Sequence, residues 1–225
     1  RFYLLKTCLF RRLGKTNLEA MKIGFSTFVL QGGRSGISTY IRDLLRFLQL
    51  EDTENEYRLL MARSDADLIP LTNRNFSKRI SRSCSSQPLL NLAWHNTVLA
   101  GLGKQLDLVH IPSARRIPVV KRTRVVATVH DLAAYSVDAK YDRARMYFNR
   151  RIVPAMIRKA DHVIAVSQFT KNDIVRYAGV PEDRISVVYS GINHDGFRPI
   201  PKDEARDRLQ MQHGLENPFF IYVSR

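Results

Sequence analysis

Short apolar runs rich in β-branched residues alternate along the chain with longer stretches whose apolar residues recur every three to four positions. The short runs predict buried strands, and the longer stretches predict amphipathic helices. Strands are expected at residues 23–27, 57–62, 108–111, 124–129, 162–166 and 185–189. Helices are expected at residues 37–48, 89–102, 142–159, 169–177 and 202–213. The alternation predicts an α/β fold, with a doubly wound, mostly parallel sheet that carries helices on both faces.

Three features interrupt this alternation. Residues 63–88 are polar and rich in Ser, Arg and Asn, which predicts an excursion without regular structure. Pro154 lies inside the expected helix 142–159 and predicts a kink or break there. The apolar run 219–223 predicts a strand that would open a second domain. We expect a basic extension at 1–20, a first domain at 21–200, a connection at 201–217 and the first strand of a second domain at 218–225.

Composition narrows the class of protein. Hydrophobic residues make up 44% of the 225 positions and charged residues 25%, which is typical of a globular chain and excludes disordered, collagen-like and coiled-coil proteins. The two cysteines, Cys8 and Cys84, are too few for a disulfide framework, and no cysteine or histidine spacing predicts a zinc site. No stretch is apolar enough to span a bilayer. These features favour a reducing, cytoplasmic location.

The net charge of +15 is concentrated in the first part of the chain, where residues 1–131 contain 21 basic and 10 acidic side chains. Such a surface attracts nucleic acid, anionic lipid or phosphorylated small molecules, or it simply keeps the protein in solution. Aromatic and basic residues alternate at 141–159, but their spacing is that of an amphipathic helix, so we expect no nucleic-acid partner. The basic segment 1–20 is interpreted as an artefact, a membrane-surface helix or a targeting peptide.

Candidate chemistry follows the first expected strand, in the loop Gly32-Gly33-Arg34-Ser35-Gly36. Glycines let backbone amides approach an anion closely, and the start of the next helix favours negative charge. The spacing matches neither a dinucleotide-binding fingerprint nor a phosphate-binding P-loop, so a tight turn is the alternative.

Two further candidates follow later strands. His130 and Asp131 end the most hydrophobic strand, where a histidine can donate to a developing negative charge or position a sugar hydroxyl, or can cap the strand end. His110 ends a similar strand next to Pro112 and is interpreted as structural. Ser167 precedes a helix and fits an N-cap, although a ligand could contact the same helix end.

In this order, several segments resemble the N-terminal domain of the family 4 glycosyltransferases, which have the GT-B fold. The segments are 21–25, 32–33 with 36–37 and Tyr40, 129–132, 159–167, 187–193 with Phe197 and Pro199, and 220–225. The resemblance spans residues 21–225 and implies two Rossmann-like domains facing a cleft, of which this chain supplies the acceptor side. It implies transfer of a sugar from a nucleoside-diphosphate sugar to a saccharide or lipid-linked acceptor, in polysaccharide or glycolipid synthesis.

The resemblance also assigns residues. It implies that Gly32, Gly33 and Arg225 approach the donor diphosphate, and that His130 and Asp131 lie beside the transferred sugar. Arg34, Ser35, Gly36 and Ser167 are the remaining candidates, expected at the acceptor or in the cleft. The family usually retains anomeric configuration and often needs no metal, so we expect neither a metal nor another cofactor. Together with the basic surface, it suggests a cytoplasmic protein at the inner face of the plasma membrane.

Two alternatives remain open. A sugar-nucleotide epimerase has a similar two-domain architecture but needs no acceptor. A non-catalytic basic module for anionic membrane or RNA would lose binding with added salt and would be indifferent to His130→Ala. An enzyme would lose turnover on that substitution, and residues 1–225 alone should be inactive because the donor-binding residues would lie outside them.

Overall fold

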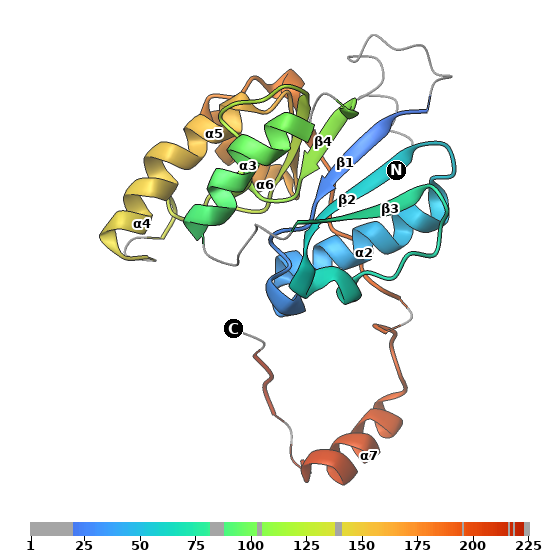
Figure 1. Ribbon diagram of the computed structural model, residues 1–225. Coiled ribbons are helices and arrows are strands. Elements are labelled where there is room, and N and C mark those ends of the chain that lie inside the picture. Colours follow the sequence, from blue (N-terminus) through green and yellow to red (C-terminus); the bar gives the residue numbers. More distant parts are fainter. Residues whose placement is uncertain are drawn as a thin grey trace. The chain divides into compact units, whose positions relative to one another are not determined.

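A computed structural model describes residues 20–81, 88–102, 105–137, 141–194, 196–215, 217 and 219–222 (Figure 1). The chain divides into two compact units, Arg1–Ser190 and Gly191–Arg225. The expected bounds of the first domain, the connection and the second domain remain predictions. None of the described helices is long and apolar enough to cross a membrane.

The first unit contains a seven-stranded parallel sheet. Its strands are β1 (Lys22–Ser26), β2 (Glu56–Ala62), β3 (Phe76–Ser81), β4 (Leu108–Ile111), β5 (Arg124–Val129), β6 (His162–Ala165) and β7 (Ile185–Val187). The strand order is β3-β2-β1-β4-β5-β6-β7, so the chain winds outward in one direction from β1 and in the other from β4. The predicted doubly wound, Rossmann-like sheet is confirmed.

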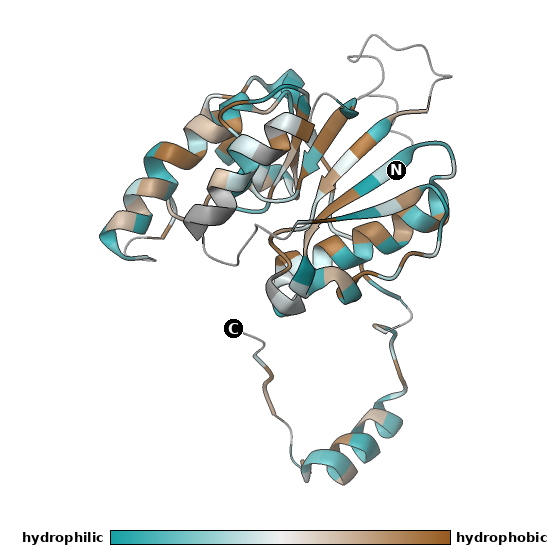
Figure 2. Ribbon diagram, in the orientation of Figure 1, coloured by the Kyte–Doolittle hydropathy of each residue, from teal (hydrophilic) through white to brown (hydrophobic). Residues whose placement is uncertain are grey.

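Helices cover the two faces of this sheet (Figure 1). The α-helices of the first unit are α2 (Gly36–Glu51), α3 (Pro88–Leu102), α4 (Arg143–Tyr147), α5 (Val153–Lys159) and α6 (Gln168–Asp173). Short 3-10 turns are η1 (Gln31–Gly33), η2 (Arg63–Leu68), η4 (Ala114–Arg116) and η7 (Glu182–Arg184), and single π-turns are η5 (Phe148–Ile152) and η6 (Ile174–Ala178). In the second unit, α7 (Lys202–His213) has no buried residue and is mostly hydrophilic (Figure 2).

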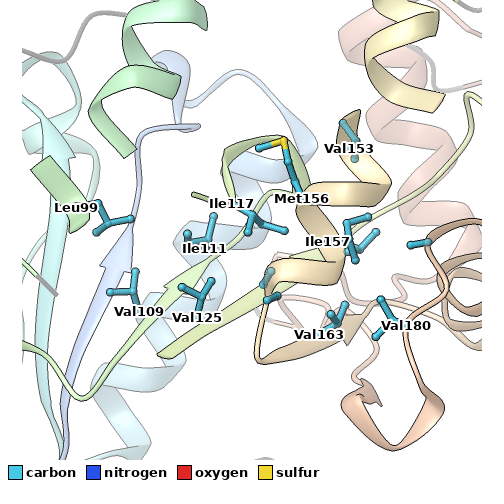
Figure 3. Close-up of a cluster of buried hydrophobic side chains, with 14 of the residues drawn as sticks. Leu99, Val109, Ile111, Ile117, Val125, Val153, Met156, Ile157, Val163 and Val180 are labelled. Atoms are coloured by element: carbon cyan, nitrogen blue, oxygen red, sulfur yellow. The ribbon is translucent and has the colours of Figure 1, made fainter. Parts of the chain in front are cut away.

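Two hydrophobic clusters fill the spaces between the sheet and its helices. On one face, Ile41, Leu45 and Leu48 of α2 pack with alternate residues of the central strands, which confirms the amphipathic pattern of that helix. On the other face, α3, α5 and η6 pack on the intervening strand residues (Figure 3). Since both faces are covered, the central strands β1, β4, β5 and β6 are buried at almost every position.

Three sequence-based expectations need correction or refinement. The region 63–88, expected to lack regular structure, contains the short helix η2 and the strand β3, which pairs in parallel with β2 over Phe76–Ser81. The helix expected at 142–159 is interrupted by the π-turn η5, just before Pro154, where a break was predicted. Residues 219–222, the described part of the strand expected at 218–225, form no strand. A strand needs a neighbour for its backbone hydrogen bonds, and these four residues pair with no strand of the described chain.

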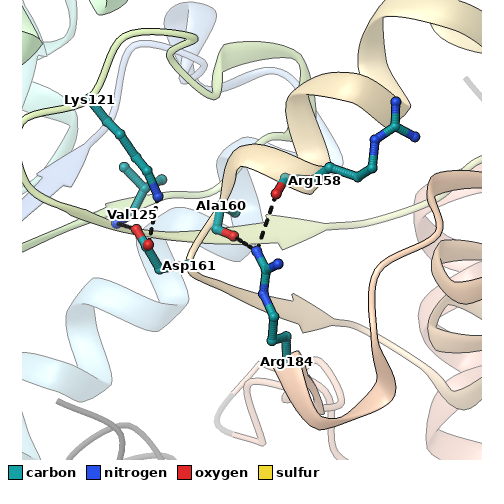
Figure 4. A network of polar contacts seen from close by, with 6 residues as sticks. All are labelled: Lys121, Val125, Arg158, Ala160, Asp161 and Arg184. Atoms are coloured by element: carbon teal, nitrogen blue, oxygen red, sulfur yellow. Dashed lines mark hydrogen bonds and ion pairs between the residues drawn. The ribbon is translucent and has the colours of Figure 1, made fainter.

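A polar network holds the ends of α5, β5 and β6 together at the amino-terminal edge of the sheet (Figure 4). The carboxylate of Asp161 accepts hydrogen bonds from the Val125 amide at 2.8 Å and from Lys121 Nζ at 2.6 Å. The guanidinium of Arg184 donates to the carbonyls of Arg158 and Ala160. Because these groups bind carbonyls and an amide at the ends of elements, they fix the register of the strands that carry the site at the opposite edge.

The packing of α5 on the sheet can be tested with Ile157, which is fully buried. Ile157→Ala should lower the free energy of unfolding by about 2–5 kcal/mol, because it removes buried methyl groups and leaves a cavity. Ile152→Ala is the matched control, because Ile152 is 40% exposed on the preceding turn. Urea denaturation followed by circular dichroism measures both. Equal losses for the two variants would contradict the assigned packing.

Candidate functional site

The carboxyl-terminal edge of the sheet brings together the loops that follow β1, β4, β5 and β6. The connections leave the sheet in opposite directions between β1 and β4, where the strand order reverses. In doubly wound sheets, ligands bind in the crevice that this reversal creates. The candidate residues of the glycine loop, His130, Asp131 and Ser167 all lie in these loops.

The glycine loop forms a tight turn directly before α2. Gly32 and Gly33 have positive φ angles of 71° and 80°, which residues with side chains rarely adopt. Both amides already have acceptors within the chain, since Gly32 N donates to Asp65 Oδ1 at 3.2 Å and Gly33 N donates to the Leu30 carbonyl at 2.9 Å. The turn therefore has the expected conformation, but its two amides are occupied in this state. Asp65, which sequence reasoning missed, comes from the 63–88 region that showed no pattern.

The amino-terminal end of α2 offers other donors. Ser35 is the N-cap, because its Oγ accepts from the Ser38 amide at 3.1 Å. The amides of Gly36 and Ile37 belong to the first helical turn, which has no internal acceptor for them, and they donate to no group of the described chain. Arg34 is exposed next to this end. An anion can therefore bind here without breaking an existing hydrogen bond.

His130 follows the last residue of β5, and its ring is held on two sides. Its Nε2 lies 3.2 Å from the Pro112 carbonyl, and its ring meets the Tyr40 ring edge to face, with centroids 4.9 Å apart and an angle of 86°. Burial lowers the pKa of His130, although the Pro112 carbonyl and the Asp131 carboxylate act in the opposite direction. The imidazole is therefore neutral near pH 7.

Asp131 and Ser167 support the loops around His130. Asp131 is exposed, and its Oδ1 accepts from the Ala133 amide at 3.0 Å, which closes a turn after β5. Ser167 caps α6, because its Oγ accepts from the Thr170 amide at 3.0 Å. Thr170 Oγ1 in turn donates to the His130 carbonyl at 3.2 Å. The structure thus brings Ser167 and His130 into one hydrogen-bonded unit, and the N-cap interpretation of Ser167 is confirmed.

A buried polar chain behind His130 was not predicted. Tyr40 Oη lies 3.3 Å from Thr128 Oγ1, and Thr128 Oγ1 lies 2.8 Å from His110 Nε2. Burial, followed by repulsion from His130, lowers the pKa of His110 to about 4. In the sequence, Tyr40 lies inside the expected helix 37–48 among its apolar positions, and His110 was interpreted as structural. The sequence signal for this chain was the hydroxyl of Tyr40, because a buried tyrosine hydroxyl usually needs a hydrogen-bond partner.

Two expectations remain, one about Arg225 at the donor diphosphate and one about a metal ion. Arg225 lies outside the described residues. Within the described ranges, no group of three or more His, Cys, Asp or Glu side chains is arranged to hold a metal ion.

Comparisons with known proteins identify the family of the chain. The model of Glycosyltransferase Family 4 matches residues 34–195. A D-inositol 3-phosphate glycosyltransferase of Streptomyces bingchenggensis is 25% identical over 93% of this chain and 51% of its own length. An O-antigen chain mannosyltransferase B of Escherichia coli is 26% identical over 90% of this chain and 55% of its own length. The chain therefore spans about half the length of these curated relatives.

A solved structure shows the same fold. The crystal structure of Anabaena HepE in complex with UDP-glucose superposes with a TM-score of 0.59 and 19% sequence identity, over 88% of this chain and 51% of that chain. At this sequence identity the match supports the fold of the chain.

The lowered pKa of His110 predicts that the free energy of unfolding depends on pH. The folded pKa of His110 is about 4 and its ordinary value is 6.5, so the folded protein binds fewer protons than the unfolded chain between these values. The free energy of unfolding should therefore fall as the pH is lowered from 6.5 towards 4. Nuclear magnetic resonance (NMR) titration of the imidazole signals measures the cause directly. A His110 midpoint at or above 6.5 would contradict the buried network.

Proposed function

The chain belongs to glycosyltransferase family 4, and on this basis we propose that it is the acceptor-side half of an enzyme that uses a nucleoside-diphosphate sugar. The acceptor is proposed to be a saccharide or a lipid-linked saccharide, in polysaccharide or glycolipid synthesis. The observation that carries the proposal is the position of His130, the glycine turn and the start of α2 at the carboxyl edge of a reversing parallel sheet. The relatives named as transferases and HepE with UDP-glucose are consistent with it.

The donor diphosphate is proposed to bind at the start of α2. Breaking the bond between the sugar and the phosphate builds negative charge on the leaving diphosphate, which fixed amide dipoles can stabilise. Gly36 and Ile37 offer amides without an acceptor in the described chain. Gly32 could add its amide only if its contact with Asp65 opened, because a carboxylate beside an anion is repulsive, and Gly33 only if its bond to the Leu30 carbonyl opened. Arg225 is proposed to supply positive charge to the same diphosphate.

His130 and Asp131 are proposed to contact the transferred sugar. The half-buried imidazole can exchange a hydrogen bond with a sugar hydroxyl, and the exposed Asp131 carboxylate can accept one. Arg34, Ser35, Gly36 and Ser167 lie in the loops and helix starts that follow β1 and β6, and we propose that they shape the cleft or contact the acceptor. In Ser35 and Ser167 the hydroxyls already cap helices, so their contribution to binding would be to hold these loops in place.

The finer features of the reaction are proposed from the family resemblance. We propose that anomeric configuration is retained and that protein groups, without a metal, neutralise the diphosphate. The basic surface would suit an acceptor held at an anionic membrane, which would place the enzyme in the cytoplasm at the inner face of the plasma membrane. Since the matched relatives are about twice as long, we propose that residues 1–225 alone are inactive.

Replacing His130 tests the proposed site. In the whole protein, His130→Ala should lower sugar transfer by about a hundredfold or more, because a positioned side chain that exchanges a proton or hydrogen bond contributes this much to a rate. His213→Ala, which changes a histidine of the exposed helix α7, is the matched control and should transfer normally. Transfer is measured with radiolabelled donors, and folding by circular dichroism.

The same assay distinguishes the alternatives. A folded His130→Ala variant with full transfer would contradict the role of the site. Formation of an epimerised donor in the absence of any acceptor would show that the protein is an epimerase and not a transferase. Sugar transfer by residues 1–225 alone at the rate of the whole protein would contradict the need for a second half.

A further inference from the structure

One aromatic contact joins the two parts of the candidate site. Tyr40 lies one turn into α2, the helix that begins at the glycine loop, and its ring packs edge to face against the ring of His130. We propose that Tyr40 is a positioning residue, which fixes the His130 ring so that Nδ1 is the nitrogen presented to the sugar substrate. This inference deepens the proposed function and depends on it only for the identity of the substrate.

The hydrogen bond of His130 determines which nitrogen is available. Nε2 lies 3.2 Å from the Pro112 carbonyl oxygen, and a carbonyl can only accept a hydrogen bond. Nε2 must therefore carry the hydrogen, and in the neutral ring the lone pair is on Nδ1. Rotating the ring by half a turn would break this bond. A neutral His130 thus accepts a hydrogen bond from a sugar hydroxyl, rather than donating one to the leaving group.

Tyr40 is itself held in place by its hydroxyl and by the packing of its helical turn. Its hydroxyl lies 3.3 Å from Thr128 Oγ1, which lies 2.8 Å from His110 Nε2. Burial raises the pKa of Tyr40, so the hydroxyl keeps its hydrogen at neutral pH and can donate it to Thr128. The next residue, Ile41, is fully buried and anchors this turn of α2 in the core. The Tyr40 ring is therefore fixed in position, and the His130 imidazole packs against it.

The charged groups around His130 do not fix the orientation of its ring. Asp131 is adjacent in sequence and favours the protonated ring, and the charge of that ring in turn lowers the pKa of His110 on β4. Thr170 of α6 contacts only the His130 carbonyl. Among the described contacts of the His130 ring, the Pro112 carbonyl fixes one atom and Tyr40 fixes the plane. Removing the Tyr40 ring should free the imidazole to turn and admit water to it.

The consequence is a physical link between the two subsites. The Tyr40 ring is carried by the helix whose first amides are proposed to bind the donor diphosphate. A shift of α2 on donor binding would therefore change the contact between the Tyr40 ring and His130. The contact couples the diphosphate end of the donor to the sugar end through a single rigid helix.

The test combines NMR of the 225-residue chain without substrate with sugar transfer by the whole protein. In the unaltered chain, nuclear Overhauser effects between the Tyr40 ring and the His130 imidazole should be present, with the hydrogen on Nε2. Tyr40→Leu should move the His130 pKa up towards the ordinary 6.5. In the whole protein it should lower kcat by about tenfold or more with little change in KM, because the reacting groups are misplaced. Tyr40→Phe retains the ring and should restore the His130 pKa and most of the kcat.

Tyr147→Leu is the matched control, because Tyr147 is 65% exposed on α4, and it should change neither quantity. Absence of the Overhauser effects, hydrogen on Nδ1, or an unchanged His130 pKa in a folded Tyr40→Leu variant would each overturn the inference. The Overhauser effects and the position of the hydrogen test it even if Tyr40→Leu does not fold. If the unaltered whole protein transferred no sugar, the proposed function would fail, while the NMR results would still decide the role of Tyr40.

Discussion

The parallel pairing of β1 with β4 is the constraint on which the rest of the structure depends. It places side by side two strands whose connections leave the sheet in opposite directions, which is where doubly wound sheets bind their ligands. Both faces of the sheet are covered by helices, and the strands pair with one another along the sheet. Polar groups that can meet a ligand are therefore concentrated where the central strands end, in the loops that contain the glycine turn and His130.

Most polar residues in these loops also have structural partners. Ser35 and Ser167 cap helices, Asp131 closes a turn, and Asp65 binds the amide of Gly32. A loop that must hold a reacting group in place needs such bonds, because each buried donor or acceptor without a partner costs free energy. Structural and chemical roles therefore coincide in the same residues. The groups left for a ligand are few, chiefly the first amides of α2 and one nitrogen of His130.

Elements whose buried residues follow a regular spacing were predictable from the sequence, and elements without such a spacing were missed. The stripe of α2 and the β-branched β5 were recognised because burial imposes periodicity or continuous apolarity. The edge strand β3 was missed because only Phe76 of its six residues is fully buried. The positions of His130 and the glycine loop at strand ends were predictable from strand order. The contact of Tyr40 with His130 was not, since it joins residues far apart in sequence and looks like any apolar position of a helix.

The most direct test of the account is an experimental structure of the whole protein with a nucleoside-diphosphate hexose bound. The account predicts that the diphosphate lies at the first turn of α2 and that a sugar hydroxyl lies within hydrogen-bond distance of His130 Nδ1. A donor bound at the amino-terminal edge of the sheet, or with its sugar away from His130, would contradict it.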